Sequence, residues 1–255
     1  MKMIYSPTEQ VTNKATSVTA SSANSSYPAS NLLVGQVSKK WRSVTAIPQI
    51  ATATLTIAVP AGVNNAIGIF GTNAIAMTVA VKDVTEATTY FTENFDLTPA
   101  NPVRTWDRVW KEWASNGFAL HIVITLTASA TATYHECGEI VVGETITLPD
   151  PLYGVGQARE NFQVIQPLAG GGFYVHPGER PRAFDLGWVM DRETEFDDLD
   201  EIYEVMGQNP IAMLLSDNAN NDMKWCGYYH MIGSPKGTHA YPSFSPVSLT
   251  LREAV

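Results

Sequence analysis

Ala53-Thr-Leu-Thr-Ile-Ala-Val59 is the stretch that predicts the fold class of the first half of this chain. Its apolar and polar residues alternate with a period of two, which is typical of a β-strand with one buried face. Residues 66–70, 77–81 and 121–126 have the same strand character, and clusters of Gly, Pro and Asn between them predict turns. Several short strands without a long helical period favour an antiparallel β-sandwich.

The second half has a different pattern. Residues 182–190 place Phe184, Leu186 and Trp188 on one face of a strand, whereas residues 193–206 are apolar at helical spacing, with acids in the first turns. A hairpin over residues 161–176 and strands at 210–215, 223–232 and 246–251 complete an α+β pattern, an antiparallel sheet with one helix. The Pro- and Gly-rich residues between the halves predict a connector. We therefore expect a sandwich over residues 1–148, a linker over 149–160 and a smaller α+β assembly domain over 161–255.

The first half resembles a known family. Val18 to Gly35, with Tyr27-Pro-Ala and Asn31-Leu-Leu, is followed by Trp41-Arg-Ser, and this stretch resembles the opening of discoidin-like (coagulation factor 5/8 type C) domains. Gly138-Glu-Ile-Val-Val resembles their closing strand. The resemblance implies a jelly-roll β-sandwich over about residues 1–144 that Trp41 plugs. Val34 stands where this family often has an Asp in a loop that commonly holds calcium, so the calcium site is not carried over.

The second half resembles the distal-tail and minor-tail components of long-tailed phages. Arg182-Ala-Phe-Asp-Leu-Gly-Trp188, the acidic helix and Trp225-Cys-Gly-Tyr-Tyr229 carry this resemblance. It implies a tail-tube-like unit that forms rings, and therefore a structural protein of the virion tail tip or baseplate, made in the host cytoplasm, whose partners are other tail proteins and copies of itself. Because one helix covers only one face of a sheet, an assembly interface is predicted. Its residues are Met190, Met213, Tyr228 and Val247.

Composition narrows the function further. The formal net charge is −9, and the 16 Lys and Arg form no basic stripe, so nucleic acid is not an expected partner. No apolar stretch is long enough to cross a bilayer, and the start of the chain lacks the apolar core of a signal peptide, so no membrane partner is expected. The sequence has no histidine pair, nucleophile elbow or phosphate loop of the known catalytic patterns. We expect no enzymatic activity, no cofactor and no metal.

One segment suggests a carbohydrate site. Trp106 and Trp110 lie among Arg104 and Arg108, and aromatic rings with cationic neighbours can stack on sugars and donate hydrogen bonds to hydroxyls. The same spacing, continued by Trp113, is that of a helical turn that packs its aromatics into a core. The loops at residues 27–31 and 87–92 are rival ligand sites. The alternative function is thus a carbohydrate-binding module for host adhesion, displayed on the virion and bound to a host surface glycan.

Overall fold

The computed structural model describes residues 1–7, 9–45, 51–98, 107–129, 131–152, 156–160, 162, 164–167, 173–176, 181–191, 194–206, 209–216, 225–237 and 244–254. Contacts divide the chain into two compact units. The first contains Met1–Leu148 and Asn209–Tyr228, and the second contains Pro149–Gln208 and Tyr229–Val255. Each unit is considered by itself.

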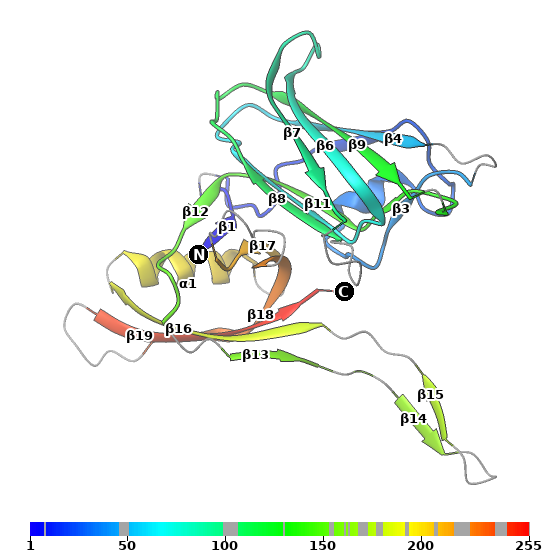
Figure 1. Cartoon of the computed structure of the whole chain (residues 1–255). Coiled ribbons are helices and arrows are strands. Elements are labelled where there is room, and N and C mark those ends of the chain that lie inside the picture. Colours follow the sequence, from blue (N-terminus) through cyan, green and yellow to red (C-terminus); the bar gives the residue numbers. More distant parts are fainter. Residues whose placement is uncertain are drawn as a thin grey trace. The chain divides into compact units, whose positions relative to one another are not determined.

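The first unit is a β-sandwich (Figure 1). Its main strands are β2 (Ser17–Ala20), β4 (Thr52–Val59), β5 (Ala66–Phe70), β6 (Ala74–Asp83), β7 (Thr89–Asp96), β8 (Arg108–Glu112), β9 (Leu120–Ala128) and β11 (Glu139–Gly143). They form an antiparallel five-stranded sheet in the order β2-β4-β9-β6-β7 and an antiparallel three-stranded sheet in the order β11-β5-β8. A 3-10 helix, η1 (Ala29–Leu33), and a two-stranded ladder of β3 (Trp41–Arg42) and β10 (Glu136–Cys137) complete the sandwich.

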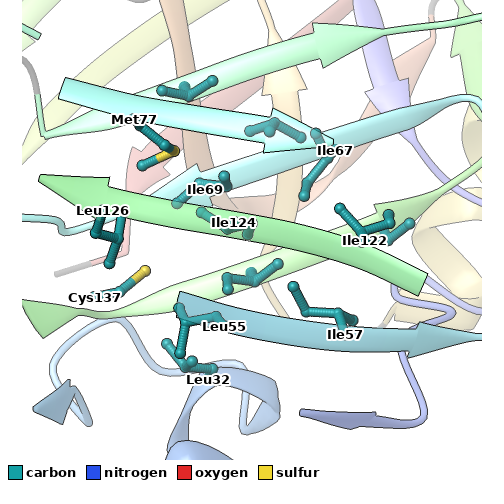
Figure 2. Packing of buried hydrophobic residues seen from close by; sticks show 14 of the residues in the cluster. Leu32, Leu55, Ile57, Ile67, Ile69, Met77, Ile122, Ile124, Leu126 and Cys137 are labelled. Atoms are coloured by element: carbon teal, nitrogen blue, oxygen red, sulfur yellow. The ribbon is translucent and has the colours of Figure 1, made fainter. Parts of the chain in front are cut away.

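The core lies between the two sheets (Figure 2). Leu55 and Ile57 of β4 and Ile124 of β9 meet Ile67 and Ile69 of β5, and all five side chains are buried. The alternation along β4 and β9 is the one that their sequences predict, because in each strand every second side chain points inward. Burial of each large aliphatic side chain stabilises the fold by about 1.5–3 kcal/mol.

The outer side of the three-stranded sheet is also covered. Strands β5 and β11 are buried at every position, which requires cover on both faces. Part of this cover comes from the returning segment Asn209–Tyr228, since the Tyr228 ring stacks on Phe70 with 5.6 Å between centroids. Within this segment, β17 (Ile211–Leu214) pairs with β1 (Lys2–Ile4), which pairs in turn with β12 (Thr145–Thr147). Residues 161–255 therefore do not form one contiguous domain, and that prediction is corrected.

The second unit contains a sheet with one helix. Its elements are β13 (Gly156–Arg159), β14 (Val164–Pro167), β15 (Phe173–His176), β16 (Arg182–Asp191), α1 (Glu195–Met206), β18 (Cys226–Gly237) and β19 (Phe244–Glu253). Strand β18 enters the unit at Tyr229, and the order from there is β18-β19-β16-β13, while β14 and β15 form a separate hairpin. Helix α1 packs against β16 (Figure 1). Because β13 pairs with β16, residues 156–159 are part of this sheet and not of a linker.

These elements confirm the predicted fold class, a mainly β chain with a sandwich and a smaller sheet that carries one helix. The predicted helix begins after Thr194, whose carbonyl accepts the first helical hydrogen bond from the amide of Asp198 at 2.9 Å. Along β16 the predicted face is buried at Phe184, Leu186 and Trp188. No helix within the described ranges has the length and apolar character needed to cross a membrane.

Candidate functional site

The predicted aromatic platform is not a sugar site at its described residues. Residues 108–112 form strand β8, and Trp110 is only 4% exposed, with its indole nitrogen donating to Glu112 at 3.0 Å. Arg108 donates to Asp107 at 2.7 Å. Because the Trp110 ring has no free face, the platform prediction is wrong for this residue. The alternative is right that the ring is buried in a core and wrong that the segment is helical. Arg104 and Trp106 lie outside the described residues.

The predicted assembly interface is also corrected. The four residues proposed for it are buried within the chain, with exposed fractions of 0% to 5%: Met190, Met213, Tyr228 and Val247. Val247 pairs with Trp188, so it shares the buried face of β16, whereas Tyr228 stacks on Phe70. An interface needs side chains that a partner can reach, and these four do not offer them.

A different group of residues gathers at the surface of the sandwich, around β3 and β10. The two strands pair so that Trp41 is opposite Cys137 and Arg42 is opposite Glu136. Trp41 and Cys137 point into the core and are fully buried, as predicted for Trp41. The period of two therefore directs Arg42 and Glu136 outward, where both are partly exposed.

Two loops bring tyrosines to this position. The carbonyl of Tyr27 accepts the Arg42 amide at 3.2 Å, and the Arg42 carbonyl accepts the Asn24 amide at 2.8 Å, so the first loop is tied to β3 through its backbone. The second loop carries Tyr134, whose carbonyl accepts the Asn73 side-chain amide at 2.9 Å. These bonds fix both loops without using the tyrosine rings.

The side chains form a compact group that we call the Tyr27–Arg42 cluster: Tyr27, Lys40, Arg42, Tyr134 and Glu136. The Arg42 guanidinium carbon lies 4.4 Å from the centroid of the Tyr27 ring and 4.8 Å from that of Tyr134. Its Nε donates to Glu136 at 3.1 Å, and the Lys40 ammonium donates to the other Glu136 oxygen at 2.7 Å. The Tyr27 residue is 36% exposed and the Arg42 side chain 31%.

This arrangement suits recognition of a polar ring compound. Exposed aromatic rings offer an apolar face for the C–H groups of a sugar, and Arg and Lys supply donors for its oxygens. The ring contacts and the ion pair hold the guanidinium in place, so less side-chain entropy is lost when a ligand binds. No group capable of proton transfer to a substrate is needed for such binding.

The sequence indicates only part of this cluster. The loop at residues 27–31 was one rival ligand site, but Lys40, Arg42, Tyr134 and Glu136 were not predicted. The alternation after buried Trp41 could have indicated that Arg42 points outward. No local signal connects Arg42 with Glu136, because 94 residues separate them. At the other rival loop Tyr90 is exposed, and the Lys111 ammonium lies 5.6 Å from the centroid of the Phe91 ring, which stacks on Trp113. The Phe91 and Trp113 rings, however, are partly buried and pack against the core of the sandwich.

A second carboxylate near the cluster has a different environment. Glu139 is buried, and one of its oxygens accepts the Gly35 amide at 2.9 Å. Burial raises the pKa of Glu139 to about 8, although hydrogen bonds from the Gly35 and Gln36 backbone act in the opposite direction. Burial, together with the charge of Glu139, also raises the pKa of Tyr228. Within the described ranges, no three His, Cys, Asp or Glu side chains are grouped to hold a metal ion.

Comparisons with known proteins give similarities of structure only. No protein-family model and no curated protein sequence matches the chain. The chain is similar to the chitosan-binding module 1 of a chitosanase/glucanase from Paenibacillus sp. IK-5, at 15% identity over 51% of this chain and 96% of that one, with a TM-score of 0.39. It is similar to the family 32 carbohydrate-binding module of NanJ from C. perfringens, in complex with galactose, at 12% identity over 57% and 100% of the two chains, with a TM-score of 0.39. It is also similar to reduced XRCC1 bound to the DNA polymerase β catalytic domain, at 15% identity over 52% and 97%, with a TM-score of 0.40.

Proposed function

We propose that this protein is a carbohydrate-binding protein and that the Tyr27–Arg42 cluster is its glycan site. The observation that carries the proposal is the position of the Arg42 guanidinium over two tyrosine rings at the surface of the sandwich. The protein holds the saccharide without changing it, so in this proposal it is not an enzyme.

The contacts in the cluster support this role in three ways. Tyr27 is exposed enough for a pyranose to stack on its ring. The backbone of each loop is held by hydrogen bonds, from backbone amides in the first loop and from the Asn73 side chain in the second, so the rings are positioned before a ligand arrives. The Glu136 carboxylate fixes Arg42 through Nε and leaves the rest of the guanidinium for ligand oxygens.

The test is a glycan array probed with the full chain, followed by calorimetric titration of the saccharides that bind. Tyr27→Ala is expected to weaken binding about tenfold or more, because it removes a stacking face worth on the order of 1.4 kcal/mol or more. Tyr90→Ala is the matched control, since Tyr90 is a similarly exposed tyrosine on β7, outside the cluster. No binding by the full chain to any saccharide, or equal losses in the two variants, would overturn the proposal.

A second candidate function is a structural role in the tail tip or baseplate of a tailed phage, with the glycan site displayed for host attachment. The observation that favours it is a set of exposed large apolar residues in the sheet of the second unit: Val189, Ile232 and Phe244, exposed by 41% to 51%. In the register of the sheet, Val189 lies opposite Pro246, and Ile232 lies opposite Thr250. Exposed apolar residues in one sheet often mark a protein interface. In this proposal, copies of the chain form a ring through this unit and contact other tail proteins in the virion.

This second proposal is tested by light scattering of the full chain at several concentrations. A mass above that of one chain is expected, and Val189→Asp is expected to reduce it, because a buried charge disfavours the interface. Val84→Asp is the matched control, since Val84 is similarly exposed in the first unit. A monomer at every concentration, or an oligomer that Val189→Asp leaves unchanged, would contradict a ring through this face.

A further inference from the structure

The Tyr27–Arg42 cluster contains more positive than negative charge. Both oxygens of Glu136 are engaged, one by the Lys40 ammonium at 2.7 Å and the other by Nε of Arg42 at 3.1 Å. Two cations thus share one carboxylate. One positive charge is left without a counter-charge in the cluster, at a place that a ligand can reach.

The segment that carries Tyr27, Lys40 and Arg42 adds no acid to balance it, and Glu139, which follows Glu136 in the other segment, is buried. Residues 10–82 contain no Asp or Glu, although the whole chain has a net charge of −9. The same stretch contributes Lys39, which is exposed directly before Lys40. The cluster is therefore a local positive site on an acidic protein, and such a site attracts anions selectively.

The geometry of Arg42 is suited to an anion with two oxygens. Among the described residues, Glu136 is the partner of Nε, and the two terminal nitrogens of Arg42 have no acceptor. A guanidinium presents its donors in a planar fork that matches the two oxygens of a carboxylate. The tyrosine rings at 4.4 Å and 4.8 Å hold the fork in place.

We propose that the site selects saccharides that bear a carboxylate, such as uronic or sialic acids. The carboxylate binds the terminal nitrogens of Arg42, and the sugar ring stacks on Tyr27. This inference rests on the proposed glycan site and names its ligand class.

The test compares matched acidic and neutral probes on the full chain by calorimetric titration. Trigalacturonic acid is paired with its fully methyl-esterified form, and sialyllactose is paired with lactose. At least one acidic probe is expected to bind about tenfold more tightly than its neutral partner. The difference is expected to shrink between about 50 mM and about 500 mM NaCl, because salt screens exposed charges.

Two variants assign the effect to Arg42. Arg42→Gln is expected to remove the preference for the acidic probe. Arg42→Lys retains the positive charge and is expected to keep part of this preference. Tyr27→Ala is expected to weaken both members of a pair, because both stack on the Tyr27 ring, whereas Arg42→Gln weakens mainly the acidic member. The melting temperature of each variant establishes that it is folded.

Three results would overturn the inference or its basis. Equal binding of acidic and neutral probes would contradict the acidic ligand class and leave the glycan site standing. A preference for the acid that survives Arg42→Gln would place the carboxylate elsewhere. Absence of binding to every probe and to the glycan array would overturn the glycan site itself.

Discussion

The β3–β10 ladder has a buried inner side and a partly exposed outer side, and neighbouring residues of each strand point to opposite sides. On the inner side, Trp41 and Cys137 pair in the core and are fully buried. On the outer side, Arg42 and Glu136 pair at the surface and form the centre of the Tyr27–Arg42 cluster. The period of two separates the positions that stabilise the sandwich from those available to a ligand. Substitutions on the two sides should therefore have separable effects.

The largest effect of a substitution is expected on the inner side. Trp41→Ala should lower the free energy of unfolding by about 3–5 kcal/mol, because it leaves a cavity in a packed core. It also removes the hydrogen bond from the indole nitrogen to the Ser22 carbonyl at 3.1 Å. Urea denaturation followed by circular dichroism measures the change. An unchanged midpoint would mean that Trp41 is not a core residue of the sandwich.

The second effect is a change of stability with pH, and it distinguishes the buried carboxylate Glu139 from the partly exposed carboxylate Glu136. The pKa of Glu139 is raised from 4.5 to about 8 in the folded chain, so the folded state disfavours its ionised form. The stability that this group contributes is fully present below pH 4.5 and is lost as the pH rises to about 8. At about 1.4 kcal/mol per pKa unit, the loss should be on the order of 5 kcal/mol over this window.

Glu139→Gln should remove this decline, since an amide does not ionise but keeps an oxygen that can accept the Gly35 amide. The measurement is urea denaturation of both proteins from about pH 5 to about pH 9. Their stability difference should change in favour of the variant as the pH rises. Glu136→Gln is the control and should not produce the same trend. Parallel pH profiles for the natural chain and Glu139→Gln would show that Glu139 is not disfavoured as an anion.

The elements with one buried face are the ones that the sequence predicts best. The strands β4, β9 and β16 and the helix α1 have regular apolar periods, and the structure contains each of them at nearly the predicted residues. Strand β8 is not predicted, because the spacing of Trp106, Trp110 and Trp113 fits a helical turn, and only Trp110 of the three lies in the strand. Its true conformation depends on pairing with β5, where Trp110 lies opposite Gly68.

Contacts between distant residues were not predictable. The segment Asn209–Tyr228 returns to the first unit and covers part of the outer face of its three-stranded sheet, which the predicted assembly interface did not take into account. The Tyr27–Arg42 cluster also depends on contacts between distant residues, since Tyr27, Arg42 and Tyr134 come from three separate segments. Local patterns indicate which face of a strand is buried, but they do not indicate which segment lies against it.

The smallest effect is expected for Arg42, directly beside Trp41. Arg42→Gln removes an ion pair with Glu136 and contacts with two rings. Partly exposed interactions of these kinds contribute about 0–1 kcal/mol each, because water competes for the charged groups. The variant should thus lose at most about 3 kcal/mol, no more than the lower end of the loss from Trp41→Ala, although it is expected to lose its preference for acidic saccharides. Urea denaturation of the two variants side by side gives the comparison. A loss for Arg42→Gln as large as that for Trp41→Ala would mean that the outer side of the ladder serves the fold and not a ligand.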